Sequence, residues 1–390
     1  MELNKKQEEG LKIAVRRYTQ GEKYTVIAGF AGTGKTTLVS FIIDALHVDE
    51  EDVAYVSFTG KAAEVLRKKG NPNAMTLHKL LYDSIPRATG GFFRKPKIHI
   101  GYKIVVVDEI SMVPKELLSL LFKHKVHVIC LGDPFQLPPI DKDADNHLLD
   151  HPHIFLDEIM RQEAESEIIQ LTMKIRNNEP IDFFQGNEVQ ILPKSELNTG
   201  MLLWADQILT ATNAQRLSIN KQVRSLLGYG SEPTNGDKVI CLRNYWEDFN
   251  VNGDPLVNGT IGTLSNPFRT WRELPKFLKT DVKRFDVICC NFESEEGTYE
   301  MIEIDRQMLL TGEKCCDWKT SYKLGRSRHS DMIPKEFAFG YAVTYWKAQG
   351  SEWDKVLVLE EKFPFDKETH NRAMYTALTR ASDKVVWIRP

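Results

Sequence analysis

The sequence predicts an α/β protein with two parallel-sheet domains, each carrying a small β insertion. Apolar runs of strand length alternate with helical patterns over residues 24–131, and such alternation favours a parallel sheet. The same alternation resumes at residues 208–227 and is completed at residues 355–388. Shorter apolar runs, separated by turns that contain glycine, interrupt both stretches and predict the two insertions.

The first domain begins with an apolar run at residues 24–28, a glycine-rich turn and an apolar helical pattern at residues 36–46. This order predicts strand, loop and helix. Further strands are expected at 53–58, 103–107 and 126–131, and further helices at 61–69 and 115–122.

The second domain is expected to contain strands at 208–211, 355–359 and 384–388 and helices at 214–227 and 371–378. The smaller insertion, residues 84–100, has Gly90-Gly91 beside Phe92 and Phe93 and predicts a hairpin. The larger insertion, about 235–335, has short runs such as 239–242 and 287–290 and predicts a small β domain.

The composition is that of an ordinary globular protein and excludes disordered and fibrous classes. The chain has 390 residues, 42% of them hydrophobic, and its 51 basic and 54 acidic residues give a net charge of −3. This balance provides no global attraction to polyanions, so a nucleic-acid site must be local. Six cysteines, no signal-like start and no membrane-length apolar run lead us to expect a reduced, cytoplasmic protein without a membrane partner. The adjacent pairs Cys289-Cys290 and Cys315-Cys316 lack zinc-site spacing.

The segment from Gly29 to Thr36, GFAGTGKT, matches the phosphate-loop pattern G-x-x-x-x-G-K-[ST] after a strand and before a helix. Its backbone N–H groups converge on phosphate oxygens, Lys35 reaches the β and γ phosphates, and the Thr36 hydroxyl ligates Mg²⁺. The residues expected to bind the nucleotide here are Gly29, Ala31, Gly32, Thr33, Gly34, Lys35, Thr36 and Thr37.

Two acids, Asp108 and Glu109, follow the apolar run at 104–107. The carboxyl ends of parallel strands are where open α/β sheets bind ligands. We expect Asp108 to hold Mg²⁺ and Glu109 to orient the attacking water. Together with the phosphate loop, these acids predict hydrolysis of ATP or GTP.

Several further segments resemble, in order, the motifs of superfamily 1 helicases. They are Leu3-Asn4-Lys5-Lys6-Gln7, residues 58–63 (FTGKAA), 76–81 (TLHKLL), 108–112 (DEISM), 132–139 (GDPFQLPP), Arg161-Gln162, 344–352 (TYWKAQGSE) and 375–380 (YTALTR). The last three are similar to motifs of the RecD-like and Dda-like branch, superfamily 1B, whose members move 5′ to 3′. The similarity extends from residue 3 to residue 382.

This resemblance implies two RecA-like P-loop domains with ATP at their interface. The implied boundaries are 1–84 and 101–178 for the first domain, 85–100 for its hairpin insertion, 179–235 and 338–390 for the second domain, and 236–337 for an SH3-like β insertion. The resemblance also implies site roles: Gln7 reads the adenine edge, Gln136 senses the γ phosphate, Arg161 and Arg380 reach that phosphate, and Gly350 and Glu352 contact the nucleotide.

Single-stranded DNA needs phosphate donors and surfaces on which bases stack. Candidates from the motifs and the smaller insertion are Phe58, Thr59, Lys61, Thr76, His78, Phe92, Phe93, Thr344 and Trp346. Phe58 and Trp346 replace the proline and the histidine usual in the family, and we hypothesise that both stack on bases. Packing in the core is the alternative for Phe58 and Trp346, and a packed or capping role is the alternative for His78.

The smaller insertion lies where related helicases carry a pin that splits the duplex, and Phe92 and Phe93 would form its apolar wedge. A surface loop is the alternative interpretation. In the larger insertion, basic residues from Lys314 to Lys335 outnumber acids locally. They either guide the strand or only solubilise the surface.

The resulting hypothesis is a monomeric ATP- and Mg²⁺-dependent 5′-to-3′ DNA translocase and helicase acting in replication, recombination or repair. Its expected partners are single-stranded DNA, forked or tailed duplexes and replication or recombination proteins, in a bacterial or phage-infected cell. Two alternatives remain at the level of sequence: a helicase of the same superfamily that remodels RNA or RNA–protein complexes, and an ATPase switch or loader that binds DNA without unwinding it.

Overall fold

The computed structural model describes residues 3–86, 92–139, 145–160, 165–278, 283–325, 327, 332–362 and 366–390. The side chains of Ser84, Pro86, Phe92, Phe93, Arg94, Trp246 and Lys276 are also outside this description. The chain divides into two compact units. Unit 1 comprises Met1–Leu81, Lys97–Ala211 and Tyr345–Pro390, and unit 2 comprises Tyr82–Pro96 and Thr212–Thr344.

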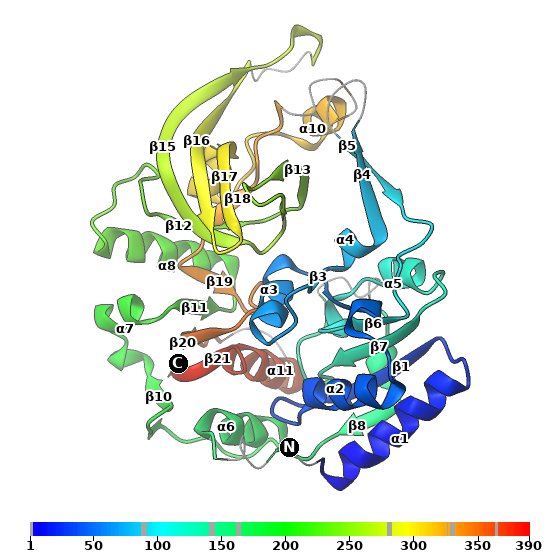
Figure 1. The fold of residues 1–390 in the computed structure, drawn as a ribbon. Coiled ribbons are helices and arrows are strands. Elements are labelled where there is room, and N and C mark those ends of the chain that lie inside the picture. Colours follow the sequence, from blue (N-terminus) through cyan, green and yellow to red (C-terminus); the bar gives the residue numbers. More distant parts are fainter. Residues whose placement is uncertain are drawn as a thin grey trace. The chain divides into compact units, whose positions relative to one another are not determined.

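Unit 1 contains a six-stranded parallel sheet with the order β3-β2-β6-β7-β1-β8 (Figure 1). Its strands are β1 (Tyr24–Gly29), β2 (Val53–Ser57), β3 (Met75–Thr76), β6 (Ile104–Val107), β7 (His127–Gly132) and β8 (Ile154–Leu156). The helices in the same part of the chain are α1 (Lys5–Thr19), α2 (Lys35–Leu46), α3 (Gly60–Lys68), α4 (Leu77–Leu81) and α5 (Lys115–Leu121).

Buried aliphatic side chains explain this sheet. All four residues of β6 and all six of β7 are buried, as expected for parallel strands covered on both faces. Ile27, Ile104 and Ile129 pack in one core cluster with Leu38 and Ile42 of α2. The core therefore fixes the ends of β1 and β6, where the phosphate loop and Asp108 begin.

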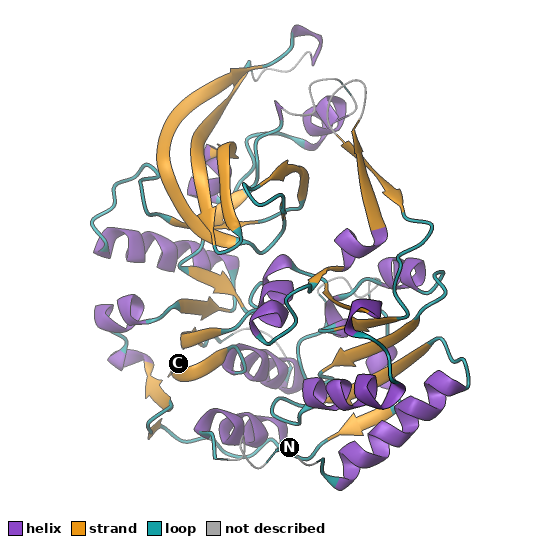
Figure 2. Cartoon of the chain, viewed as in Figure 1, coloured by secondary structure: helices purple, strands orange, loops and turns teal. Residues whose placement is uncertain are grey.

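Unit 1 also contains a second sheet, in which the strands of this unit follow the order β11-β20-β21-β10-β9. All neighbours are parallel except the short edge strand β9. The strands are β9 (Phe184–Gln185), β10 (Val189–Pro193), β11 (Gln207–Thr210), β20 (Trp353–Leu359) and β21 (Ala381–Arg389), and the helices are α6 (Glu167–Arg176), α7 (Thr199–Trp204) and α11 (Lys367–Leu378). Figure 2 shows helices lying beside the strands of both parallel sheets.

Unit 2 is mainly antiparallel. Its five-stranded sheet has the order β17-β16-β15-β12-β18 and includes two long curved strands (Figure 1). The strands of unit 2 are β4 (Tyr82–Pro86), β5 (Phe92–Pro96), β12 (Lys238–Cys241), β13 (Tyr245–Phe249), β14 (Pro255–Leu256), β15 (Ile261–Glu273), β16 (Arg284–Ser294), β17 (Gly297–Asp305), β18 (Phe337–Phe339) and β19 (Ala342–Thr344). Its helices are α8 (Asn213–Leu226), α9 (Arg306–Thr311) and α10 (Trp318–Gly325).

The α/β class and the two parallel sheets are confirmed, and two expectations about elements were wrong. The second sheet was expected to start at residue 208, but β10 precedes it in the chain and pairs in parallel with β21. The larger insertion was expected to be β structure, but it also contains α9 and α10. The expected hairpin is present as β4 paired with β5. No helix in the described part of the chain is long and apolar enough to cross a bilayer.

Candidate active site

The phosphate loop joins the end of β1 to the start of α2. Gly32 and Gly34 have φ angles of +73° and +75°, which side chains rarely tolerate. A Cβ on Gly29 would lie 2.7 Å from the Thr33 hydroxyl. No side chain caps α2, so its first turn suits an anion. The glycine pattern therefore reflects real backbone requirements of an anion-binding loop.

Lys35 begins α2 and folds back over the loop. Its ammonium donates to the carbonyls of Gly29 and Phe30 at 2.8 and 2.9 Å. The Thr33 hydroxyl donates to the Phe30 carbonyl at 2.8 Å, which closes the loop on itself. The Ala31 N–H donates to the Tyr375 hydroxyl at 2.9 Å, so this N–H already has a protein partner.

A pocket of about 570 Å³ opens beside the loop within unit 1. Most of the predicted nucleotide residues line it: Ala31, Gly32, Thr33, Gly34, Lys35, Thr36, Thr37, Asp108, Glu109, Gln136, Gly350, Glu352 and Arg380. Gly29 and Gln7 do not line it. The pocket thus combines residues from both parallel sheets of unit 1.

Asp108 and Glu109 follow β6 at the wall of this pocket. The Glu109 N–H donates to the Asp108 carboxylate at 2.9 Å. Burial, followed by the charge of Glu109, raises the pKa of Asp108 to about 6. Glu109 has a left-handed backbone with φ +52°, an uncommon conformation that is often found at functional sites.

Glu109, Gln136 and Arg380 form one polar cluster in the pocket. A guanidinium nitrogen of Arg380 lies 3.6 Å from the Glu109 carboxylate. The Gln136 amide fits between them when its nitrogen donates to Glu109 Oε2 at 3.1 Å and its oxygen accepts from Arg380 Nη2 at 3.3 Å. The cluster brings together residues of three different motifs, two from the first sheet and one from the second.

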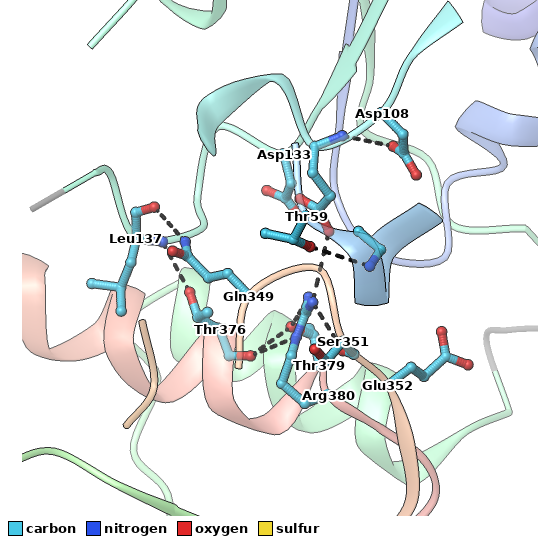
Figure 3. A network of polar contacts seen from close by, with 12 residues as sticks. Thr59, Asp108, Asp133, Leu137, Gln349, Ser351, Glu352, Thr376, Thr379 and Arg380 are labelled. Atoms are coloured by element: carbon cyan, nitrogen blue, oxygen red, sulfur yellow. Dashed lines mark hydrogen bonds and ion pairs between the residues drawn. The ribbon is translucent and has the colours of Figure 1, made fainter. Parts of the chain in front are cut away.

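The Arg380 guanidinium is held by the loop and helix around it (Figure 3). It donates to the carbonyls of Thr376 and Ser351 at 3.1 and 3.3 Å and to the Thr379 hydroxyl at 3.1 Å. Only 7% of its side chain is exposed. A buried arginine with this many fixed contacts has a defined position, which an arginine acting on a phosphate needs.

The segment from Asp133 to Pro138, which carries Gln136, is attached to the C-terminal part of unit 1. The Leu137 N–H donates to the Thr376 hydroxyl at 2.9 Å, and the Gln349 amide donates to the Leu137 carbonyl at 2.7 Å. Figure 3 shows these contacts beside Arg380. Four residues of the helicase-like motifs have contacts here that their sequence does not predict: Asp133, Gln349, Tyr375 and Thr376. Nothing local in the sequence indicates partners more than 200 positions away.

Gln7 is completely buried behind the loop. Its amide donates to the Thr33 carbonyl at 3.2 Å and accepts from the Asn4 N–H at 3.1 Å. The Asn4 side chain accepts from the Gln7 N–H, which completes a capping box at the start of α1. Gln7 therefore supports the loop from behind, and its expected contact with adenine stays a prediction.

Gly350 and Glu352 border the pocket from the second sheet. Gly350 has φ +71°, and a Cβ there would lie 2.8 Å from the Ala62 side chain. The Glu352 carboxylate lies 2.6 Å from the ammonium of Lys69, another pocket residue. The close approach at Gly350 explains why this position favours glycine.

The nucleic-acid candidates of the first sheet cluster around α3 and α4. The rings of Phe58 and His78 lie 5.8 Å apart. Thr59 caps α3 through Ala62, and the Thr76 hydroxyl accepts from the Lys79 N–H at 3.2 Å. Lys61 forms an ion pair with Glu64 at 3.0 Å. These residues shape the local backbone, and their contacts with DNA stay predictions.

Trp346 is half-buried, and its indole N–H donates to the Pro138 carbonyl at 3.3 Å. The side chain is therefore neither fully buried nor free on the surface. Thr344 is buried at the end of β19 in unit 2. Arg161 lies outside the described residues, as do the side chains of Phe92 and Phe93.

Comparisons with known proteins show what the chain is similar to. An AAA domain model matches residues 2–190, and a UvrD-like helicase C-terminal domain model matches residues 339–388. The ATP-dependent RecD2 DNA helicase of Deinococcus radiodurans is 27% identical over 93% of this chain, which spans 46% of that protein. The ATP-dependent DNA helicase Dda of Enterobacteria phage T4 is 20% identical, and the match covers 99% of both chains.

The fold is similar to that of the Pif1 helicase from Bacteroides crystallised with ADP-AlF3 and single-stranded DNA. The TM-score is 0.53 at 18% identity, and the match covers 99% of this chain and 92% of that one. This similarity bears on the fold alone and indicates RecA-like parallel sheets. The motifs, the two domain models and the relatives together show that the chain resembles ATP-dependent DNA helicases over most of its length.

Proposed function

We propose that this chain is an ATP-dependent 5′-to-3′ single-stranded DNA translocase and DNA helicase. The observation that carries the proposal is the cluster of Glu109, Gln136 and Arg380 in the pocket of the phosphate loop. Such a cluster would connect both parallel sheets to one bound nucleotide. Hydrolysis of that nucleotide would therefore change the contacts between residues of the two sheets. The names of RecD2 and Dda, both ATP-dependent DNA helicases, support the helicase part of this proposal. The 5′-to-3′ direction is proposed from the resemblance of the motifs.

The residues fit ATP and Mg²⁺. Thr36 and Asp108 provide the hydroxyl and carboxylate oxygens that Mg²⁺ prefers, and both line the pocket. Burial and the neighbouring Glu109 disfavour the charged form of Asp108, so a cation beside it would relieve that cost. Bound there, Mg²⁺ would neutralise charge on the β and γ phosphates.

The protein residues would share the remaining work of hydrolysis. Lys35 would exchange its contacts with the Gly29 and Phe30 carbonyls for phosphate oxygens. Glu109 would orient the attacking water, while Gln136 and Arg380 would stabilise the charge that develops on the γ phosphate. Arg161 is proposed as a second arginine at this phosphate on its motif alone.

We assign the DNA path to residues of the helicase motifs. Phe58 and Trp346 are proposed to stack on bases, with phosphate contacts from Thr59, Lys61, Thr76, His78 and Thr344. The β4–β5 hairpin, residues 82–96, is proposed as the pin with Phe92 and Phe93 as its wedge. The five-stranded sheet of unit 2 is proposed as an SH3-like insertion that guides the strand.

Strand separation of tailed duplexes tests the function. DNA duplexes with a 5′ or a 3′ single-stranded tail, and an RNA-tailed counterpart, are mixed with ATP and Mg²⁺. Lys35→Ala serves as the inactive variant, and Lys12→Ala, which removes an exposed lysine of α1, serves as its matched control. We expect unwinding of the 5′-tailed DNA alone, by the wild type and Lys12→Ala.

The other outcomes separate the alternatives. Unwinding from the 3′ tail would contradict the polarity, and unwinding of the RNA-tailed duplex alone would favour an RNA remodeller. Hydrolysis stimulated by single strands without any unwinding would favour a switch or loader. Near-normal hydrolysis by Lys35→Ala would overturn the assignment of the nucleotide site.

A further inference from the structure

Tyr375 joins three segments that lie far apart in the sequence. It belongs to α11, and only 1% of it is exposed. Its hydroxyl accepts a hydrogen bond from the Ala31 N–H at 2.9 Å and donates one to Asp133 Oδ2 at 2.6 Å. Ala31 is part of the phosphate loop, and Asp133 directly follows β7. One hydroxyl therefore holds the loop, the carboxyl end of the first sheet and a helix of the second sheet.

We propose that Tyr375 is a positioning residue that fixes the phosphate loop relative to the segment carrying Gln136. The proposal rests on the proposed ATP hydrolysis, because it describes how that site is held. Tyr375 does not line the nucleotide pocket, whereas the groups that it holds, Ala31 and Asp133, both do. Its effect is therefore transmitted through these two residues.

Asp133 depends on this hydroxyl. It is 2% exposed, and its other oxygen accepts from the Phe135 N–H at 2.9 Å. Burial is the main cause that raises its pKa. Loss of the Tyr375 hydroxyl would remove its hydrogen bond to Asp133 Oδ2 and would leave the Ala31 N–H without its tyrosine acceptor. Buried polar groups that lose a partner move or take up water.

Movement of Asp133 would displace Gln136, which lies three residues later in the same segment. Tyr375 holds one end of the segment through Asp133, and the neighbouring Thr376 holds the other end by accepting from the Leu137 N–H at 2.9 Å. Gln136 lies between these two attachments and contacts Glu109 and Arg380. A displacement of about 1 Å in a reacting constellation can reduce the rate about 100-fold.

Tyr375→Phe removes the hydroxyl and keeps the ring, which contacts the ring of Phe135 edge-on at 5.1 Å. Tyr299→Phe is the matched control. Tyr299 is also 1% exposed, and its hydroxyl donates to the Pro255 carbonyl at 3.2 Å in unit 2. Both variants delete one buried tyrosine hydroxyl, so they share the general cost of losing a buried hydrogen bond.

The experiment measures kcat and KM for ATP at saturating single-stranded DNA, together with the thermal midpoint. For Tyr375→Phe we expect kcat to fall about tenfold or more, as loss of a hydrogen bond to a charged group allows, with a smaller change in KM. Tyr299→Phe should lower only the thermal midpoint. A Tyr375→Phe enzyme with kcat within about twofold of wild type would overturn the proposal, whatever its thermal midpoint.

A second variant tests the route through Asp133. Asp133→Asn removes the charge while keeping one carbonyl oxygen, and it should reduce kcat in the same direction. If Tyr375 acts through Asp133, the double variant should lose little more than the stronger single variant, since the two changes break one connection. Fully additive losses would overturn this route. Asp133→Asn also keeps the test available if Tyr375→Phe does not fold.

Hydrogen exchange separates this proposal from the proposed function. In Tyr375→Phe, a peptide covering residues 29–37 should exchange faster than in the wild type and in Tyr299→Phe, because the Ala31 N–H has lost its acceptor. This measurement needs no ATP hydrolysis. If the wild type fails to hydrolyse ATP, the proposed function fails, and the exchange data alone then decide whether Tyr375 holds the loop. Unchanged exchange would overturn that role.

Discussion

Arg380→Lys tests the chemistry of the site most directly, because it keeps the positive charge and removes the guanidinium fork. Arg380 makes three hydrogen bonds, to Thr376, Ser351 and Thr379, and it also faces Glu109 at 3.6 Å. A lysine ammonium concentrates its donors on one nitrogen. It cannot reproduce contacts that the structure distributes over three guanidinium nitrogens.

The two expected effects differ in size. Loss of two of these hydrogen bonds at about 1 kcal/mol each predicts a decrease of about 2 kcal/mol in the free energy of unfolding. If the guanidinium stabilises the γ phosphate, kcat should fall about 1,000-fold or more, which corresponds to about 4 kcal/mol. The loss of activity should therefore exceed what partial unfolding explains.

The assay compares ATP hydrolysis at saturating single-stranded DNA, ADP affinity and urea unfolding for Arg380→Lys and for Arg224→Lys. Arg224 is the matched control because its side chain is also 7% exposed and pairs with Asp237 at 2.8 Å, within unit 2. Arg224→Lys should lose stability and keep kcat. A decrease in kcat of less than about tenfold in Arg380→Lys would refute the phosphate-facing role and leave Arg380 as a structural arginine.

Three further predictions concern the loop, its strand and the DNA path. Gly34→Ala should weaken ADP binding and lower stability by about 1–2 kcal/mol, because φ is +75° and the new Cβ would lie 2.6 Å from the Gln7 amide; unchanged affinity would contradict this. Burial lowers the pKa of His153, whose Nδ1 accepts from the Val26 N–H at 2.9 Å. Below pH about 6.5 the unfolded chain therefore binds more protons than the folded chain. The free energy of unfolding, measured with urea, should fall from pH 7 to pH 5. The fall should be smaller in His153→Asn, because the asparagine keeps an acceptor but does not titrate. Trp346→Ala should weaken binding to labelled single-stranded DNA about tenfold if the ring stacks on a base. Equal affinity would contradict stacking and would give Trp346 a structural role through its hydrogen bond to the Pro138 carbonyl.

The parts of the site that could be predicted are those that a short segment specifies alone. The phosphate loop needs glycine where φ is positive and a lysine at the start of a helix, and both requirements are visible within eight residues. Asp108 follows four buried aliphatic residues of β6, so its place at the carboxyl end of the strand could be predicted. Local chemistry and the strand pattern agree at both positions.

Elements defined by distant partners were missed. The strand β10 (Val189–Pro193) is short and ends in proline, so its own pattern is weak. It becomes a strand because it pairs with β21, which lies almost 200 residues later. Likewise, α9 and α10 lie in a region whose glycine turns indicated only strands. In each case tertiary pairing or packing outweighed the local signal.

Gln7 and Tyr375 show why residue roles are harder to predict than residue positions. The spacing of Asn4 and Gln7 fits a capping box as well as a helicase motif, and the structure uses the Gln7 amide for the box and for the Thr33 carbonyl. Tyr375 looks like one more core residue of α11, yet its hydroxyl meets Ala31, 344 positions earlier in the chain. A motif places a side chain near a site, but hydrogen-bond partners from other elements decide what its polar atoms do. The polar atoms of Tyr375 and Asp133 are therefore where mutation should separate support of the loop from chemistry on the nucleotide.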